Sequence, residues 1–501
     1  MNYLGIDLGT TFSLVAYVNS QGVPALFNDH HDANEFRTPS VIHISEEGCL
    51  VGGVLEDLLE DEPSLSQARF FKLSMGKGTG FYKDGFGRNW YPESLSAIIL
   101  KKLMHDVESA IHEEIDGVVI AVPANFNDAQ RNATKHAAML AGLPSPSLIE
   151  EPIAAATYYG YADKTGEQTL FVYDLGGGTF DATVLQSSPE GLYALATEGT
   201  NEIGGKGIDE LIMAQVAEEY KRLHGVDPRQ DPASESQLRR FSTETKLLLA
   251  KPGRNQVRKT LLLAGKTLDF LITRHQFELL IDHMIEDTLK VSQKCLESAG
   301  LDWMMIDKVL LTGGSSLLPL VLDKIAFACG KPREDIICKQ PHQAVAYGAA
   351  LIADQRNATK KNTLQRISAF DLGIRVRNPE TGLPMVQALI KKNSPVPAAE
   401  STTFYTTRED QPRMVIEVVQ QKGQDDQEKS LGYFIFNIEA PRKGYPVEIT
   451  LAYDLEGMVK VTAKDPDTNQ VLERIMDEEG QAVDEVLIEQ QSWINKLRIN
   501  Q

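Results

Sequence analysis

The sequence predicts an α/β region built as two lobes and, after it, an all-β domain. Residues 1–356 alternate strand-like apolar runs with amphipathic runs of helical period, as in α/β folds with partly parallel sheets. Within this region the turn Asp-Leu-Gly, with Thr close behind, occurs at Asp7 and at Asp174, each time after an apolar run. Beyond a polar stretch near residue 360, short strand-like segments are separated by Gly, Pro, Asn and Asp.

The elements of the first region are predicted from their periodicity. Apolar runs predict strands over residues 118–122, 170–173 and 308–312. Amphipathic runs predict helices over residues 92–110, 128–141, 208–223 and 276–299. The two Asp-Leu-Gly turns are 167 residues apart, which suggests one copy in each lobe of a duplicated scaffold.

Changes in sequence texture suggest the domain boundaries. Residues 1–356 form the α/β domain, and the polar, aperiodic residues 357–369 are the expected linker. Residues 370–480 are the expected antiparallel β-domain, with strands over 404–407, 414–419, 432–438, 447–453 and 458–463. Residues 481–501 are expected to contain one short helix of about 22 Å, over residues 483–497.

Composition narrows the functional classes. A chain of 501 residues is too long for a single core and suits two or three domains. The net charge of −20, without a basic stripe, argues against nucleic-acid binding. Four scattered cysteines predict reduced thiols. No apolar run is long enough for membrane insertion, and the first strand leaves no room for a signal peptide, so we expect a cytoplasmic protein.

The repeated turn has a chemical interpretation. Glycines let backbone N–H groups approach phosphates, and threonine hydroxyls add further donors. A carboxylate beside them is suited to hold a hydrated Mg²⁺. Two such turns facing each other would bind the phosphates of a nucleotide from both sides. A third glycine turn, Thr312-Gly-Gly-Ser315, also comes after a strand, and no turn matches the phosphate loop of Walker ATPases or the Rossmann fingerprint.

Six segments, in order, resemble the DnaK branch of the 70-kilodalton heat-shock chaperones. They are Gly5-Ile-Asp-Leu-Gly-Thr-Thr11, Val122-Pro-Ala-Asn-Phe-Asn-Asp-Ala-Gln-Arg131, Glu151-Pro-Ile-Ala-Ala-Ala156, Tyr173 to Asp181, Gly204-Gly205 and Thr312-Gly-Gly-Ser315. Leu389 to Pro397 and Lys429 to Phe434 extend the resemblance past the linker, and Phe71 to Gly76 is most similar to HscC-type members. The resemblance implies an actin-like (ribonuclease-H-like) two-lobed ATPase domain and, after it, a β-sandwich that binds peptides.

The resemblance also implies a role for each matching residue. Asp7 and Asp174 would hold magnesium through water beside ATP or ADP, with potassium as a second candidate ion. The implied catalytic residues are Lys72, Glu151, Asp174, Thr179 and Asp181. The implied nucleotide contacts are Gly9, Thr10, Thr11, Gly176, Gly177, Gly178, Gly204, Gly205, Lys246, Gly313, Gly314 and Ser315. Pro123, Arg131 and Glu151 match the family's relay between the nucleotide and the domain interface.

Two departures from the family pattern concern the adenosine side and the linker. Thr243 stands where a glutamate is expected, and Leu247 and Leu317 stand where relatives carry a guanidinium over the adenine, so we expect weaker ATP binding. In the linker, Arg366 replaces an aspartate. Ser147 replaces an arginine that relatives use with J-domain co-chaperones, so any J-domain partner is expected to make altered contacts.

A further departure concerns the β-domain and the C-terminal segment. The apolar positions of the peptide cleft correspond to Ile374, Phe404, Met414, Ile416 and Val447, although a plain β-core could use the same residues. Arg377 and Thr407 replace small or apolar residues of the arch over the peptide, and Arg377 would favour acidic clients. The terminal helix supplies only the beginning of the family's helical lid, so we expect rapid peptide exchange.

The preferred interpretation is a lidless ATPase chaperone that binds extended apolar segments of unfolded proteins and hydrolyses ATP slowly. One alternative is an adaptor or regulator whose ATP hydrolysis is decoupled from peptide binding by the altered linker. A less favoured alternative is a small-molecule kinase of the actin superfamily, against which the β-domain argues.

Overall fold

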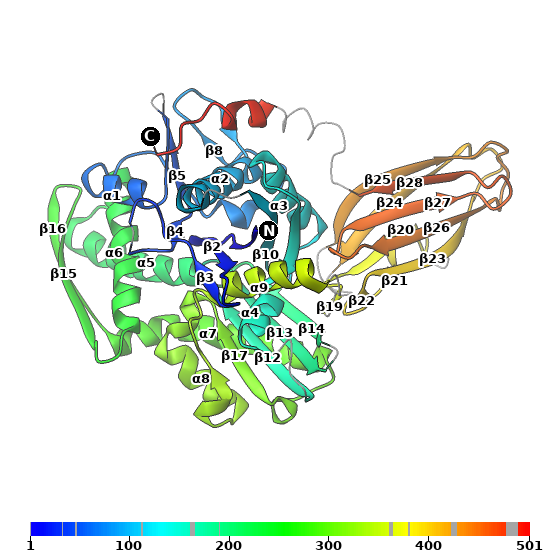
Figure 1. Ribbon diagram of the computed structural model, residues 1–501. Coiled ribbons are helices and arrows are strands. Elements are labelled where there is room, and N and C mark those ends of the chain that lie inside the picture. Colours follow the sequence, from blue (N-terminus) through cyan, green and yellow to red (C-terminus); the bar gives the residue numbers. More distant parts are fainter. Residues whose placement is uncertain are drawn as a thin grey trace.

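A two-lobed α/β body carries a β-domain that projects from one side (Figure 1). The computed structural model describes residues 2–32, 34–45, 48–111, 114–160, 166–189, 191–359, 364–378, 381–421, 428–476 and 489–500, with the backbone alone at 356–359. None of the helices in these ranges is both long enough and apolar enough to cross a membrane.

The sheet of the first lobe combines an antiparallel meander with two parallel strands. Its order is β11-β10-β1-β2-β3, and β4 also pairs with β2. The meander is β1 (Asn2–Asp7), β2 (Phe12–Val18) and β3 (Pro24–Leu26), and the parallel strands are β10 (Ile115–Val122) and β11 (Pro146–Glu150). Smaller strands are β4 (Thr38–Pro39), β5 (Val41–Ile44), β6 (Cys49–Val51), β7 (Ala68–Arg69), β8 (Tyr82–Lys83) and β9 (Asn89–Trp90).

The sheet of the second lobe repeats this topology. The meander β12 (Gln168–Leu175), β13 (Phe180–Ser188) and β14 (Gly191–Thr200) is joined by the parallel strands β17 (Lys308–Thr312) and β18 (Ile336–Ile337). The order β18-β17-β12-β13-β14 therefore matches β11-β10-β1-β2-β3 strand for strand. The two Asp-Leu-Gly turns join the first two strands of each meander, in accord with the predicted duplication.

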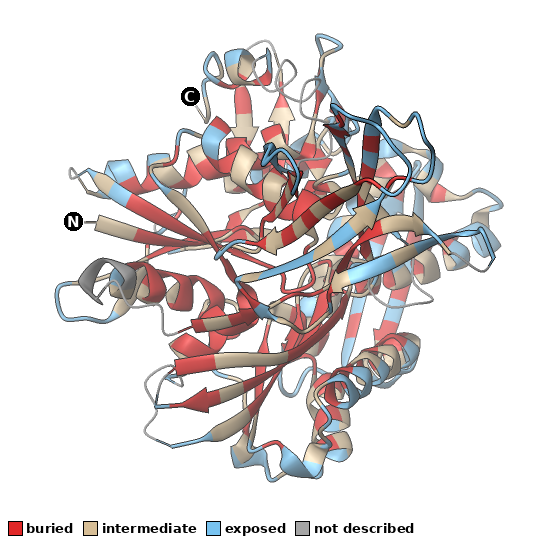
Figure 2. Ribbon diagram, turned by 90° about the vertical axis from the view of Figure 1, so that its right-hand side faces the viewer, coloured by how far each residue is buried: buried red, intermediate tan, exposed pale blue. Residues whose placement is uncertain are grey.

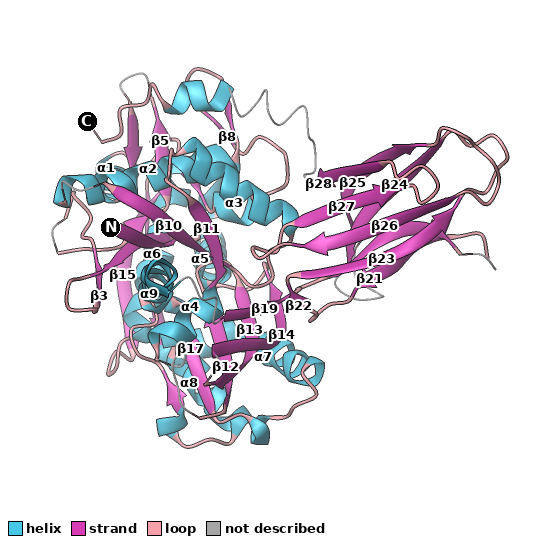
Figure 3. Cartoon of the chain, turned by 45° about the vertical axis from the view of Figure 1, so that its right-hand side comes forward, coloured by secondary structure: helices cyan, strands magenta, loops and turns pink. Residues whose placement is uncertain are grey.

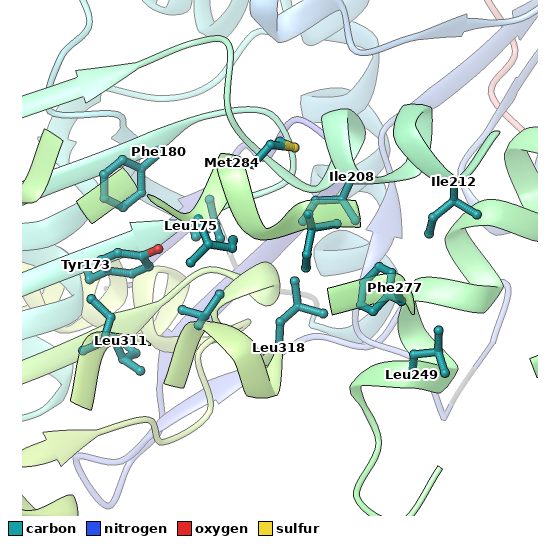
Figure 4. Packing of buried hydrophobic residues seen from close by; sticks show 14 of the residues in the cluster. Tyr173, Leu175, Phe180, Ile208, Ile212, Leu249, Phe277, Met284, Leu311 and Leu318 are labelled. Carbon is teal, nitrogen blue, oxygen red and sulfur yellow. The ribbon is translucent and has the colours of Figure 1, made fainter. Parts of the chain in front are cut away.

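Helices cover both sheets (Figure 3). Those of the first lobe are α1 (Gly53–Asp61), α2 (Pro92–Ala110) and α3 (Asp128–Leu140). Those of the second are α5 (Gly205–His224), α6 (Pro232–Ala250), α7 (Arg274–Ser298) and α8 (Pro319–Cys329), with a hairpin of β15 (Gln256–Leu263) and β16 (Lys266–Thr273). Strong periodicity made α2 and β17 predictable to the residue. Figure 4 shows how Tyr173, Leu175 and Phe180 from the second sheet pack with Ile208, Phe277 and Leu318.

Two helices of small residues lie between the sheets, α4 (Glu151–Tyr158) and α9 (Ala344–Thr359). A Cβ on Gly348 of α9 would lie 1.7 Å from the carbonyl oxygen of Ala154 in α4. A Cβ on Gly5 of β1 would lie 2.0 Å from the backbone nitrogen of Ala350. Only glycine allows this backbone approach.

The β-domain is a sandwich of two antiparallel sheets, as the sequence predicts. One sheet has the order β21-β20-β24-β25, from β20 (Asp371–Arg377), β21 (Pro384–Ile390), β24 (Arg413–Gln421) and β25 (Lys429–Asn437). The other has the order β23-β26-β27-β28, from β23 (Ala398–Tyr405), β26 (Pro446–Tyr453), β27 (Val459–Lys464) and β28 (Val471–Ile475). Buried positions alternate with partly or fully exposed ones along β25, β26 and β27, while the edge strand β28 is exposed throughout. Figure 2 shows that the strands inside the lobes are instead buried over long runs.

The segment expected as an irregular linker is more ordered than its composition suggests. Helix α9 continues to Thr359, and residues 364–367 form strand β19 (Leu364–Ile367). Strand β19 pairs in parallel with β14 and on its other side with β22 (Pro395–Val396), so the sheet of the second lobe continues into the β-domain. Residues 360–363 lie outside the described part.

The C-terminal segment packs on the first lobe. Its helix covers residues 489–494 in the described part, whereas the prediction was 483–497, of which 483–488 lie outside the described residues. Ile494 is fully buried, and the rings of Trp493 and Trp90 have centroids 5.5 Å apart. Cys49 N donates to Arg498 O over 2.9 Å, and Asn500 N donates to Cys49 O over 2.9 Å, so the chain extends the edge of β6.

We expect Gly348→Ala to destabilise the α/β body by about 3 kcal/mol or more, because the new methyl group meets backbone atoms that cannot rotate away. Thermal unfolding would measure the loss. Gly207→Ala in α5 is the matched control, since its Cβ would meet the flexible end of Met284 at 2.9 Å and alanine favours the helix. Equal stability of the two variants would contradict the role given to the α4–α9 contact.

Candidate functional site

The two Asp-Leu-Gly turns face each other across the cleft between the lobes. A Cβ on Gly177 would lie 2.2 Å from Thr11 Oγ1, and a Cβ on Gly178 would lie 2.8 Å from the Thr10 methyl group. Gly177 and Gly178 of the second turn therefore lie so close to Thr11 and Thr10 of the first turn that no side chain fits between them. Thr10 and Thr11 of the first turn and Gly176, Gly177 and Thr179 of the second line one cavity, a combination of glycines and hydroxyls that is suited to bind phosphates.

The other two glycine segments support the second turn. Gly205 N donates to Gly176 O over 3.0 Å, and Lys206 N donates to Gly177 O over 2.7 Å. Ser315 Oγ donates to Gly176 O over 3.0 Å. A Cβ on Gly313, whose φ is +78°, would lie 2.4 Å from Leu175 O. The turn is thus held in place by backbone contacts from two other segments of its own lobe.

A single cavity lies between these turns. Most residues assigned from the sequence to the nucleotide line it: Asp7, Gly9, Thr10, Thr11, Lys72, Glu151, Asp174, Gly176, Gly177, Thr179, Gly205, Lys246, Gly313, Gly314 and Ser315. Gly178, Gly204 and Asp181 are not among its lining residues. Gly204 packs against Gly178, and Asp181 is buried beside Asn125 and Gly199, from where it acts on the charge of Asp174.

Three buried carboxylates and one ammonium group form the floor of the cavity. Lys72 lies in a short 3-10 helix, Phe71–Ser74, and its Nζ is 3.0 Å from Glu151 Oε1. Burial, with Glu151 adding to its effect, raises the pKa of Asp7 to about 7. Burial, together with the smaller effects of the charges of Glu151, Asp181 and Asp7, also raises the pKa of Asp174 well above its usual range.

This excess of negative charge fits a divalent cation. Within the described ranges, no three His, Cys, Asp or Glu side chains are placed to hold a metal directly. Asp7 and Asp174 lie in the two Asp-Leu-Gly turns and line the cavity, so they suit the water-held magnesium ion that the family resemblance implies. Such an ion would neutralise phosphate charge and lower the free energy of the ionised carboxylates.

At the opposite end of the cavity, Lys246 and Thr243 contact Asp209, a residue that the sequence did not single out. Lys246 Nζ lies 2.8 Å from Asp209 Oδ1 and donates to Gly205 O over 2.9 Å. Thr243, at the position of the expected glutamate, donates to Asp209 Oδ2 over 2.9 Å. Asp209 lies in α5 just after the Gly204-Gly205 pair, and this position was its only sequence signal.

The cavity is also lined by apolar and cationic side chains. Leu247 lines it, while Leu317 is half exposed and is not among the lining residues. Arg37 and His342 also line the cavity, and burial, with Arg37 adding to it, lowers the pKa of His342. His342 fits closely against Gly314, where a Cβ would lie 2.4 Å from the imidazole Cε1.

A second charged cluster lies directly behind the buried carboxylates and Lys72 of the cavity floor. Glu150, the last residue of β11, accepts from Arg366 Nε over 2.6 Å and lies 3.0 Å from Arg131 Nη2. All three side chains are buried. Burial alone would raise the pKa of Glu150, but the guanidinium groups of Arg366 and Arg131 hold it at about 2. The substituted linker residue Arg366 thus has a partner, which its sequence neighbourhood did not reveal.

The predicted relay residues Pro123, Arg131 and Glu151 lie in or next to this second charged cluster. Phe126 N donates to the carbonyl of Pro123 over 3.1 Å, and Arg131 Nε donates to the carbonyl of Phe126 over 3.2 Å. Glu151 begins α4 beside Lys72, immediately after Glu150. Of these two adjacent carboxylates, Glu151 therefore lines the cavity, whereas Glu150 lies at the domain interface.

The predicted peptide-binding residues lie at one end of the sandwich. Ile374, Met414, Ile416 and Val447 are buried in its core, and Phe404 packs partly against them. Arg377 and Thr407 are exposed at the ends of β20 and β23, where Arg377 donates to Gly382 O over 3.2 Å. Their assignment to a peptide cleft stays a prediction.

Comparison with known families agrees with this architecture. The chain matches the family model described as Hsp70 protein over residues 70–493. That range contains the second phosphate turn, the linker and the β-domain. The chain therefore belongs to the Hsp70 family, and in general terms it is an ATP-dependent chaperone whose family binds nucleotide with magnesium, unfolded polypeptides and J-domain co-chaperones.

We expect Gly177→Ala to weaken ATP binding by about 1–3 kcal/mol, because its methyl group would push Thr11 and the first turn away. Titration calorimetry would measure the change. Gly166→Ala is the control, since Gly166 is exposed, is not among the residues that line the cavity, and has open space where its Cβ would lie. If both variants bind ATP like the wild type, the phosphates do not lie between the turns.

Proposed function

We propose that this chain binds and slowly hydrolyses ATP between its lobes and that hydrolysis controls the binding of extended apolar segments in the β-domain. The observation that carries the proposal is the continuous contact path from Lys72 and Glu151 through Glu150 to Arg366. It connects the phosphate end of the cavity to the segment that enters the β-domain. Branch assignment to HscC-type members and a cytoplasmic location belong to the same proposal; the four free cysteines support the location.

The catalytic part of the proposal assigns roles by position. The two glycine turns would hold the phosphates, and Lys72 would stabilise charge on the γ-phosphate. Glu151 and Thr179 would orient the attacking water, because both line the cavity beside Lys72. Asp181 would act indirectly, through the charge state of Asp174. A bound magnesium ion, held through water by Asp7 and Asp174, would supply charge neutralisation.

The docked β-domain supports coupling through contacts besides Arg366. Asp128, at the start of α3, accepts from Val459 N over 2.9 Å, and its own N–H donates to Gln420 Oε1 over 3.2 Å. Lys135 pairs with Glu456, and Lys392 pairs with Glu198 in the second lobe. The β-domain therefore contacts both lobes, so a change in the angle between the lobes would strain this interface.

Arg366 also contacts the β-domain directly. It donates to the carbonyl oxygens of Leu455 and Glu456 in the turn after β26, besides its pair with Glu150. The linker residue thus joins three parts of the molecule. An inward, paired Arg366 and a neutral Ser147 leave a J-domain partner with contacts unlike those of relatives, which is why we propose altered J-domain recognition.

The sandwich offers a place for an extended client. Strands β20 and β24 pair only from Asp371↔Gln421 to Ile374↔Val418, although β20 continues to Arg377 and β24 begins at Arg413. The two strands therefore separate at the end where the predicted cleft residues gather. A client strand between them could hydrogen-bond to the backbone of Val415, which faces away from β25. Arg377 at this end favours acidic side chains in the client.

We expect Lys72→Ala to lower steady-state ATP hydrolysis by about 10²–10³-fold, because it removes the one ammonium group beside the γ-phosphate position. Phosphate release with and without an unfolded model peptide would measure this. Lys77→Ala, an exposed lysine of the same segment, is the control and should match the wild type. Turnover that peptide leaves unchanged in the wild type would favour the decoupled adaptor, and turnover that survives in Lys72→Ala would refute the catalytic assignment.

We expect Arg366→Ala to abolish peptide stimulation of hydrolysis and to loosen the docked β-domain, since breaking a buried ion pair on one side costs about 3–5 kcal/mol. Small-angle scattering of the intact chain would report the loosening as an increased radius of gyration. Arg442→Ala removes an exposed pair with Asp467 in the same domain and should change neither quantity. Normal peptide stimulation in Arg366→Ala would exclude this path as the coupling route.

A further inference from the structure

Strand β25 forms an exposed edge of the sandwich. It is the last strand of its sheet and, among the described residues, pairs with β24 alone. Ile438 N donates to Pro412 O over 2.8 Å, which fixes the alternation of hydrogen-bonded pairs along these strands. By that alternation Tyr433, Ile435 and Asn437 point their backbone N–H and C=O groups away from β24. These groups can be satisfied by another strand.

The same edge exposes apolar side chains. Tyr433 is 58% exposed, Ile435 is 47% exposed, and Val415, directly opposite Ile435 on β24, is 53% exposed. The run 430–438 contains no charged residue and no proline. Natural proteins usually protect an edge with charges, proline or a bulge, and the one bulge here lies at the other end of the strand, between Val418 and Val419 of β24.

Strand β28, at the edge of the other sheet, provides a contrast. It is also exposed, and its apolar Val471 and Ile475 are accessible to solvent. However, Glu473 and Arg474 occupy the middle of this strand, and Glu473 pairs with Lys460 on the neighbouring strand. Charged side chains therefore protect the β28 edge from pairing with another strand, whereas residues 430–438 of the β25 edge carry no charge.

The charge of the β-domain permits contact between two copies. Residues 364–476 contain 14 Lys and Arg against 16 Asp and Glu, a difference of −2, whereas the whole chain has 50 against 70. Most of the net negative charge thus belongs to the α/β body. The exposed half of β25 also lies far from that body, because Gln420, which contacts Asp128, is paired with Lys429 at the near end of the strand.

We propose that β25 pairs antiparallel with β25 of a second copy of this chain, about a two-fold axis at Phe434. In this register Tyr433 of each copy lies opposite Ile435 of the other, which forms two aromatic–β-branched pairs on the exposed face. The outward backbone groups of Tyr433 and Ile435 are then hydrogen-bonded in both copies. The interface is isologous, so it closes at the dimer and makes one continuous sheet from the two β25-containing sheets.

The first test is the oligomeric state of the full chain. Sedimentation velocity over a concentration series should show a monomer–dimer equilibrium for the wild type. Ile435→Lys should weaken dimerisation by roughly tenfold or more, because symmetry introduces the charge twice. Tyr433→Lys should act alike and serves as the second variant if the first folds poorly. Val471→Lys on β28 is the matched control and should leave dimerisation unchanged.

The second test determines the register. Tyr433→Cys and Ile435→Cys are prepared as separate variants and oxidised alone or mixed. Because each position faces the other across the axis, a disulfide-linked dimer should form in the mixture and not in either variant alone, with the wild type as background for the native cysteines. A wild type that stays monomeric, or that dissociates with Val471→Lys rather than Ile435→Lys, would overturn the proposal. The proposal would also be overturned if the chain stays monomeric and its β25 edge binds only a client peptide.

Discussion

The position of the two lobes depends on backbone contacts that only small residues permit. Helix α9 touches β1 at Gly5 and α4 at Gly348, with no side chain between them. Strand β1 ends at Asp7 and α4 begins at Glu151, so these contacts also set the distance between two of the carboxylates in the cavity. The same constraint makes the two phosphate turns face each other, because each turn extends directly from a strand of its lobe.

Two neighbouring residues at the centre of the molecule, Glu150 and Glu151, lie in different electrostatic surroundings. Glu150 faces two guanidinium groups and stays ionised, while Glu151 faces one ammonium group and two further carboxylates. Burial makes each of these charges costly unless it is compensated. The interface cluster is compensated by two guanidinium groups, whereas the three carboxylates of the cavity floor share the ammonium group of Lys72. Under the proposed function, binding of nucleotide with its metal would change the electrostatics around Glu151, while the adjacent Glu150 faces the domain interface.

Periodic elements were predictable because their signal is local. Helix α2, strand β17 and strands β24 to β27 of the β-domain carry their hydrophobic pattern within a few residues, and the repeated turn is visible as a motif. Long-range pairs were not predictable in this way. Glu150 and Arg366 are 216 positions apart, and nothing near either residue identifies the other. In β19 the polar Arg366 is buried while Ile367 is only partly covered, so hydropathy suggested an irregular linker where a strand exists. The docking of Trp493 and Ile494 likewise depends on a surface formed by distant segments.

The docking of the C-terminal segment gives the chain the topology of a closed loop. The β-domain leaves the second lobe through β19 and returns to the first lobe through residues 489–500, so it is an inserted domain rather than an appendage on one tether. Attachment at both ends limits the volume it can explore when its interface opens, and its effective concentration at the α/β body stays high. If hydrolysis releases the β-domain as we propose, its recapture requires no large search, and the two anchor points bias it toward the same docked orientation.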